Sequence, residues 1–207
     1  MTGRITIDLF TTLDGVSQAP GAPDEDTSGG FRWGGWQAPF ADEVIDQEVM
    51  AGITAMDALV LGRRTYDIFA DYWPRHVEGD AEGAIGRRFA EIPKYLAAHG
   101  GDDPAWTGTS RLAADAVAAV AALRAVHEDI HVIGSIDFAH ALLAAEAYDV
   151  LQLWVYPVVL GEGRKVFPDG AAPARLTLLA PAVTGPSGAV SLRYGPAGAP
   201  TTGTMGA

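Results

Sequence analysis

Apolar positions along the first two-thirds of the chain follow two different spacings. In residues 5–10 every second side chain is a large aliphatic one, which predicts a strand with one strongly apolar face. The runs at 58–61 and 130–133 are almost entirely apolar, as is typical of strands buried on both faces of a parallel sheet. Residues 95–98 are a weaker strand candidate.

Between these runs the apolar residues recur at spacings of three and four, which predicts amphipathic helices. In the first helix Ile45, Val49 and Ile53 fall on one stripe. A short helix is also expected within 74–92, after a polar connection. The longer helices are expected within residues 41–56, 66–73, 112–123 and 137–146.

The last third of the chain changes character. Residues 150–160, 176–183 and 190–194 are strand-like with no long helix between them, so they are expected to pair antiparallel. Strands alternating with helices, followed by this finish, predict an α/β fold: a mostly parallel central sheet with helices on both faces and an antiparallel C-terminal hairpin. Residues 1–195 are expected to form a single domain and 196–207 a flexible tail.

One long loop stands out because it is rich in glycine, proline and aspartate and yet carries aromatic residues. It spans 16–40 and includes Trp36 and Phe40. Long loops with aromatic content often cover a site. Trp36 and Phe40 are therefore candidates for stacking on a flat heteroaromatic substrate, and a packing role is the alternative for both.

Charge and composition narrow the classes of partner. The chain has 26 acidic and 14 basic residues and a net charge of −12, which repels nucleic-acid phosphates and anionic lipids. No apolar run approaches the roughly 20 residues that a membrane-spanning helix needs. The chain has no cysteine, and its five histidines lack close ligand spacing, so no metal site is predicted. A cytoplasmic protein with a small-molecule ligand is expected.

Two predicted strands lead into helices through a glycine. The first junction is Gly62-Arg63-Arg64-Thr65, and the second is Gly134-Ser135, followed by Asp137. Helix N-termini at the ends of parallel strands expose unpaired N–H groups that bind phosphate, and guanidinium groups add bidentate contacts. Two such junctions suggest a ligand with a diphosphate. A capping role for Asp137 and a solvated first turn for the two arginines are the alternatives.

Four segments carry a family pattern: Thr12-Leu13-Asp14-Gly15, residues 61–66, residues 132–135 and residues 156–167. Together they resemble the dihydrofolate-reductase-like family, which includes the reductase domain of bacterial riboflavin biosynthesis. The resemblance runs from about residue 3 to residue 194. It implies a three-layer fold and an NADPH-dependent oxidoreductase that transfers a hydride to a small conjugated substrate, a heterocycle of the pterin or pyrimidine kind.

The resemblance also assigns residues to the cofactor. Arg63 and Thr65 match the family's phosphate contacts, and Gly134 with Ser135 matches its paired-glycine turn. The diphosphate is then expected to span the two junctions, with the nicotinamide near the first strand.

Two carboxylates compete for the place beside the substrate. Asp42 follows a stretch similar to the one that places an acid under the pterin in dihydrofolate reductase, and it is a candidate for orienting or protonating a substrate nitrogen. In the riboflavin-type relatives the aspartate of the Asp-Gly turn faces the substrate, so Asp14 is the rival. A helix N-terminal acid in solvent is the alternative for Asp42.

Two departures from the family pattern affect the cofactor. Ala98-His99 stands where relatives often have a serine and a basic residue at the adenosine end. Asp137 stands where dihydrofolate reductase has an arginine for the 2′-phosphate, and an aspartate there suits a free ribose hydroxyl. Arg63, Arg64 and His99 favour NADPH, with NADH as the alternative cofactor.

A second class of function stays open at this point. The same departures permit a non-catalytic relative, a ligand-binding or dimeric scaffold protein that keeps the reductase fold. The antiparallel strands near the C-terminus commonly form a subunit interface in this family, so the resemblance implies a homodimer.

Overall fold

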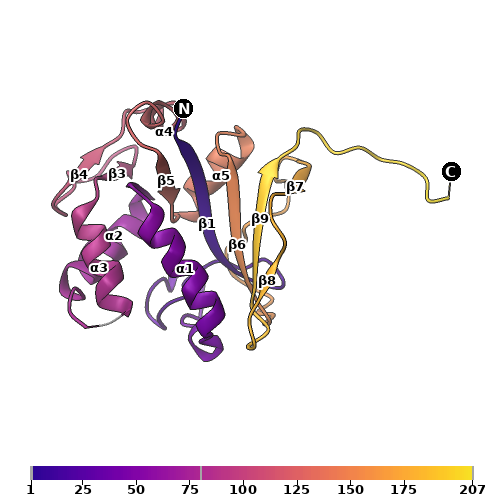
Figure 1. The fold of residues 1–207 in the computed structure, drawn as a ribbon, viewed down its shortest axis with the longest axis horizontal. Helices are drawn as coiled ribbons and strands as arrows, with labels where there is room; N and C mark the ends of the chain where they lie inside the picture. The colour runs from indigo at the N-terminus through magenta and orange to yellow at the C-terminus, as the bar shows by residue number, and fades with distance from the viewer. Residues whose placement is uncertain (1, 80, 207) are drawn as a thin grey trace.

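The computed structural model describes residues 2–79 and 81–206, and its centre is one mixed sheet (Figure 1). The strands are β1 (Arg4–Thr12), β2 (Ala58–Gly62), β3 (Lys94–Ala97), β4 (Thr109–Arg111), β5 (Asp129–Val132), β6 (Val150–Tyr156), β7 (Leu176–Leu178), β8 (Val183–Thr184) and β9 (Val190–Pro196). Their order across the sheet is β4-β3-β2-β5-β1-β6-β9-β7, and β8 also pairs with β9.

Strand direction divides the sheet into two parts. From β4 to β6 every neighbouring pair is parallel. The strands β7 and β8 and the strand β6 all run antiparallel to β9. The predicted fold class is therefore confirmed: a mostly parallel sheet with an antiparallel C-terminal part.

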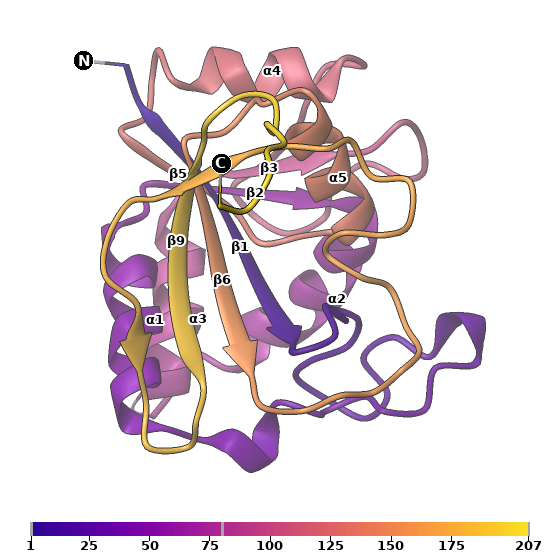
Figure 2. The same ribbon diagram turned by 90° about the vertical axis from the view of Figure 1, so that its right-hand side faces the viewer.

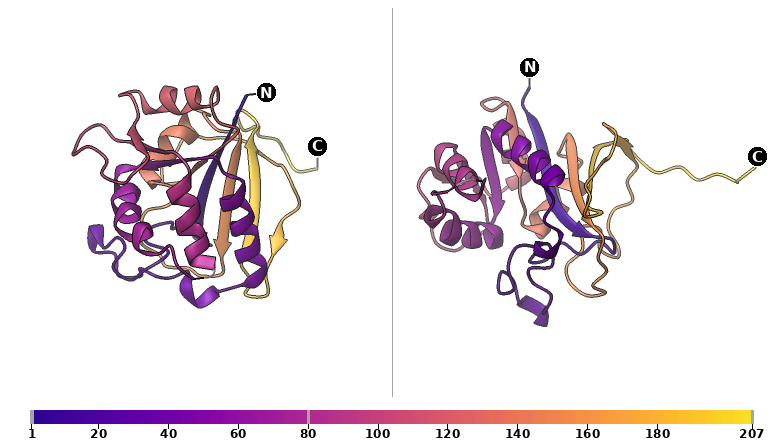
Figure 3. Two further views of the ribbon diagram at one scale, coloured as in Figure 1. Left: turned by 60° about the vertical axis from the view of Figure 1, so that its left-hand side comes forward. Right: turned by 60° about the horizontal axis from the view of Figure 1, so that its bottom comes forward.

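Helices cover both faces of this sheet, as Figures 1 and 3 show. Helices α1 to α3 pack on one face and α4 and α5 on the other. Among the described residues no helix combines the length and apolar character needed to cross a membrane. The bounds are α1 (Glu43–Ala55), α2 (Arg63–Tyr72), α3 (Ala81–Glu91), α4 (Ala116–Leu123) and α5 (Ile136–Ala144).

The alternation in β1 explains how the two faces differ. Ile5, Ile7 and Leu9 point into the core beneath α4 and α5, because successive side chains of a strand point to opposite faces. Asp8 therefore belongs to the opposite face, on the side of α1. The apolar run of β2 is buried at every position, as expected for a strand with helices on both sides.

The structure differs from the sequence-based boundaries in several places. β4 is an additional three-residue edge strand that was expected to be loop. The strand expected over 176–183 is two short strands, β7 and β8, with an unpaired stretch between them. β9 extends to Pro196, and backbone hydrogen bonds to Arg175 continue through Ala197 and Gly198. Beyond Gly198 the chain leads away from the sheet (Figure 1), in which β1, β6 and β9 lie side by side (Figure 2).

Candidate functional site

The two glycine junctions lie side by side. β2 and β5 are neighbouring parallel strands, so their carboxyl ends meet at one edge of the sheet. The N–H of Gly62 donates to the carbonyl of Gly134 at 3.0 Å. The N-termini of α2 and α5 therefore lie side by side at this edge of the sheet, which is the position where open α/β sheets bind ligands. The strip of surface along residues 62–65 and 134–137 is called the groove below.

Both junctions require glycine for steric reasons. A Cβ on Gly62 would lie against the hydroxyl of Ser135 and 2.8 Å from its backbone nitrogen. Gly134 has φ of +77°, and a Cβ there would lie 2.8 Å from Thr65 Oγ1. The peptide bond between Gly134 and Ser135 is cis. The close approach of the two turns depends on the missing side chains.

The helices at this groove begin without a side-chain cap. Neither α2 nor α5 has a side chain that accepts from its first turn, whereas α1 is capped by Asp42 and α4 by Asp115. The amide groups at the start of α2 and α5 thus remain available to an anion. Two such N-termini on adjacent strands give the groove a positive potential in a strongly acidic protein.

The two arginines of the first junction point to different places. Arg63 donates to the carbonyls of Gly100 and Asp102, in the loop after β3. Arg111, at the end of β4, donates to the same two carbonyls. The Nε of Arg63 is buried without a hydrogen-bond partner. His99 is exposed at the start of this loop. The loop after β3 therefore gathers two guanidinium groups.

Arg64 instead faces the long loop 16–40. Its guanidinium lies 2.9 Å from Oδ1 of Asp26 and donates to the hydroxyl of Ser28. Arg164, from the segment after β6, lies 2.6 Å from the other oxygen of Asp26. Arg164 is also 3.8 Å from Asp137, in the first turn of α5. Asp26 is thus held between two cations at the edge of the groove.

Asp42, one of the two candidate acids, is occupied by backbone amides. Its carboxylate caps α1 by accepting from Val44 and Ile45, and it accepts from Ser187 at 2.7 Å. The N–H of Ser187 above all lowers the pKa of Asp42, against the opposing effect of burial. Asp42 is only 7% exposed, and each of its two carboxylate oxygens accepts at least one backbone hydrogen bond. Asp42 is therefore not an acid in solvent.

Asp14 is engaged in the same manner. It accepts from the hydroxyl of Thr12 at 2.6 Å and from the amides of Leu160 and Gly161. Partial burial raises the pKa of Asp14, but these hydrogen bonds outweigh it and the pKa is lowered. Asp14 therefore fastens the end of β1 to the segment that follows β6.

Aromatic side chains gather beside these anchors. Trp36 and Phe40 both contact the ring of Tyr156, with centroids 5.7 and 6.1 Å away. Trp36 is buried and donates its indole N–H to the carbonyl of Gln18. Phe40 is only partly buried. Burial raises the pKa of Tyr156 to about 12, against the lowering effect of the hydrogen bond that Gln37 donates to its hydroxyl.

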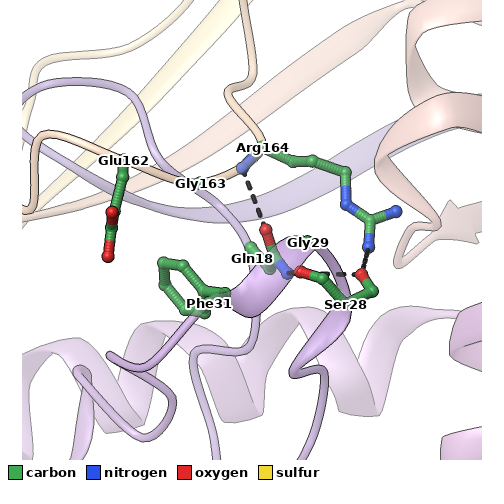
Figure 4. Close-up of a pocket in the computed structure, with 7 residues that line it drawn as sticks. All are labelled: Gln18, Ser28, Gly29, Phe31, Glu162, Gly163 and Arg164. Carbon is green, nitrogen blue, oxygen red and sulfur yellow. Dashed lines mark hydrogen bonds between the residues drawn. The ribbon is translucent and has the colours of Figure 1, made fainter.

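A cavity of about 260 Å³ lies where the long loop meets the segment after β6 (Figure 4). Gln18 joins the two segments: its side chain donates to the carbonyl of Ser28 and accepts from the backbone N–H of Arg164. The ring of Phe31 and the side chain of Glu162 form another part of the wall. Ser28 and Arg164 line this cavity and also contact Asp26. The cavity is therefore adjacent to Asp26.

A buried polar network lies on the α1 face of the sheet, away from the groove. His131 Nδ1 is 2.6 Å from Asp8, and its Nε2 is 3.4 Å from Asp129. Burial alone lowers the pKa of His131, but the two carboxylates outweigh this effect and raise the pKa to about 9. His131 is therefore a buried cation at neutral pH.

Three residues of the site were not singled out from the sequence: Asp26, Arg111 and Arg164. Asp26 is one of several acidic residues in a loop whose path the sequence does not determine. Arg164 lies in the family-like segment 156–167, and a basic residue there after two glycines was the available signal. Arg111 is the last residue of β4, a three-residue strand whose sequence has no clear strand pattern.

Comparisons with known proteins agree with this geometry. No curated protein sequence matches the chain. A candidate riboflavin biosynthesis protein from Shewanella sp. PV-4 superposes with a TM-score of 0.69, at 16% identity, over 95% of this chain and 99% of that chain. A pyrimidine reductase-like protein from Corynebacterium diphtheriae gives 0.59, at 13% identity, over 94% and 92%.

Dihydrofolate reductase from Enterococcus faecalis, solved with NADP(H), gives a TM-score of 0.55 at 14% identity and covers 95% of this chain and 98% of that chain. At these identities the superpositions establish the fold, which is dihydrofolate-reductase-like. The model of the RibD C-terminal domain matches residues 4–187. The chain therefore belongs to the RibD C-terminal domain family, within the dihydrofolate-reductase-like fold.

Proposed function

We propose that the protein is an NAD(P)H-dependent reductase that transfers a hydride to a small conjugated, heterocyclic substrate of the pterin or pyrimidine kind. The observation that carries this proposal is the pair of uncapped helix N-termini joined by the Gly62 to Gly134 hydrogen bond. Such a pair suits the two phosphates of a dinucleotide. When bound, the nicotinamide supplies the hydride.

The residues at the groove fit this cofactor. Gly62 and Gly134 let the two junctions pack against each other, because a Cβ at either glycine would collide with the opposite turn. This close packing brings the N-termini of α2 and α5 near enough for one diphosphate to reach both. Thr65 offers a hydroxyl in the first turn of α2, and Ser135 offers one at the position immediately before α5. The pterin or pyrimidine class is supported by family membership and by the aromatic cluster around Tyr156.

We assign the adenosine end to the loop after β3, and this supports NADPH rather than NADH. Arg63 and Arg111 converge on the carbonyls of residues 100–102. Two guanidinium groups favour a 2′-phosphate, which carries nearly two negative charges. Asp137 is paired with Arg164 instead, so its charge is partly compensated at the other junction.

Titration with NADPH and NADH, followed by tryptophan fluorescence, tests the function. We expect NADPH to bind at least about tenfold more tightly than NADH. Arg63→Gln is expected to weaken NADPH roughly tenfold and NADH by less than about twofold, because only NADPH has the 2′-phosphate.

Arg75→Gln is the matched control for that variant. Arg75 and Arg63 each form an ion pair with an aspartate four positions away in the chain, but Arg75 lies in the short 3-10 helix Trp73–Arg75 that follows the C-terminal end of α2. Both affinities should be unchanged in this control. If wild-type protein binds neither nucleotide, the reductase proposal is wrong and a scaffold function is favoured.

We further propose that Asp42 acts as a positioning residue and does not exchange a proton with substrate. Asp42→Asn is expected to lower the melting temperature by about 2–4 °C, because it weakens the cap of α1 and the link to Ser187. NADPH affinity should stay within about twofold. Differential scanning calorimetry and the same titration measure both.

Asp115→Asn is the control, because Asp115 caps α4 through a single amide. Its melting temperature should fall by less than that of Asp42→Asn. An unchanged melting temperature in Asp42→Asn would contradict the positioning role. It would favour the alternative, in which Asp42 protonates a substrate nitrogen.

A further inference from the structure

We propose that Arg164 is a phosphate-binding residue of the groove and that Asp26 occupies the place of a ligand phosphate until the ligand displaces it. This inference rests on the proposed function, since it takes the groove between α2 and α5 as the diphosphate site. It adds a residue from outside both junctions and an internal competitor for the ligand.

The position of Asp26 is the first step of the argument. One carboxylate oxygen lies 2.9 Å from Arg64, in the first turn of α2. The other lies 2.6 Å from Arg164, whose guanidinium also reaches Asp137 at the start of α5. Through these two cations the carboxylate bridges the N-termini of both helices at the groove.

The chemistry of the contacts is that of a bound phosphate. Asp26 presents two oxygens to two guanidinium groups, and it also accepts from the backbone N–H of Ser28 at 3.1 Å. Two arginines with a backbone amide form a set of donors that suits phosphate at least as well as carboxylate. The side chain of Asp26 is only 11% exposed, so a ligand cannot add to the site without moving it.

The surrounding loop allows such a movement. Residues 27–30 are exposed, and the contacts between the segment 26–28 and the rest of the protein are mainly polar. Gln18 holds the carbonyls of Asp26 and Ser28, while the hydroxyl of Ser28 lies against both guanidinium groups. The contacts of Ser28 with the two guanidinium groups are exposed, and exposed polar contacts exchange at low cost. A ligand diphosphate can therefore take over both arginines as Asp26 leaves.

The consequence is a measurable competition. Because part of the ligand's binding free energy is used to displace Asp26, the apparent affinity is lower than that of the open site. Asp26→Asn removes the competing charge, and we expect it to bind NADPH and inorganic pyrophosphate roughly tenfold more tightly than wild type. Arg164→Gln should weaken both ligands roughly tenfold.

Asp24→Asn is the matched control. It removes the same charge from the same loop, but Asp24 is exposed and has no hydrogen bond or ion pair to the residues that the structure describes. Its affinities should stay within about twofold of wild type. Calorimetric titration of the three variants and wild type with each ligand gives the comparison.

Several results overturn this inference. Equal or weaker pyrophosphate binding by Asp26→Asn does so, as does the absence of pyrophosphate binding by both this variant and wild type. A wild-type protein that binds pyrophosphate but no nucleotide contradicts only the reductase proposal, since the pyrophosphate titrations still compare the variants.

Hydrogen exchange of wild type covers the case in which Asp26→Asn does not fold. On addition of saturating pyrophosphate, the amides of residues 24–30 should exchange faster, because the segment loses its contacts to Arg64 and Arg164. Unchanged or slower exchange in this segment overturns the displacement of Asp26.

Discussion

Replacing His131 by glutamine lowers the free energy of unfolding by about 3 kcal/mol at pH 6, because Asp8 and Asp129 lose the cation between them. The pKa of His131 is raised from 6.5 to about 9 in the folded protein. A group with a raised pKa contributes its full stability below pH 6.5 and loses it as the pH rises through 9. Chemical denaturation of wild type and His131→Gln between pH 6 and pH 10 measures this.

The difference between the two proteins should shrink over this range, because the wild type loses the contribution that the variant lacks throughout. His99→Gln is the control, since His99 is exposed and has no interaction with the described residues. Its stability should stay within about 0.5 kcal/mol of wild type. A constant difference from pH 6 to pH 10 would mean that the imidazole is not the buried cation.

Gly62→Ala disrupts the groove while leaving the rest of the chain unchanged. The added methyl group would press on the backbone nitrogen of Ser135, so the two junctions must separate. We expect the free energy of unfolding to fall by about 2 kcal/mol and the dissociation constant for NADPH to rise roughly 30-fold. Denaturant titration and fluorescence binding provide the two measurements.

Gly203→Ala adds the same methyl group where no atom lies within contact distance, and it should change neither quantity. Full NADPH affinity in Gly62→Ala would show that the ligand does not bind between the two helix N-termini.

The strands and junctions could be predicted because their signals are local. The apolar run of β2 and the glycine after it indicate a buried strand that turns into a helix, whatever the rest of the fold does. The edge strand β4 has only three residues, all at least partly exposed, and a stretch so short and so little buried has no detectable period. Its existence depends on pairing with β3.

The carboxylates show where local signals stop. A helix N-terminal position was one of the two expectations for Asp42, and Asp42 does cap α1. It is not in solvent, however, because the turn after β8 covers it and the N–H of Ser187 donates to its carboxylate. That contact spans most of the chain. The position of Asp26 between Arg64 and Arg164 depends in the same way on the path of a long loop, which composition does not determine.

The order of the strands has a consequence for how the chain is made. β1 leaves the ribosome before the other strands of this sheet, yet both of its neighbours, β5 and β6, lie in residues 129–156. Until that stretch has been synthesised, neither edge of this apolar strand has a neighbouring strand to pair with. Strands with unpaired edges can pair with other chains and aggregate. Such distant pairing also slows folding. The nascent protein is therefore most vulnerable to aggregation before its sixth strand is complete.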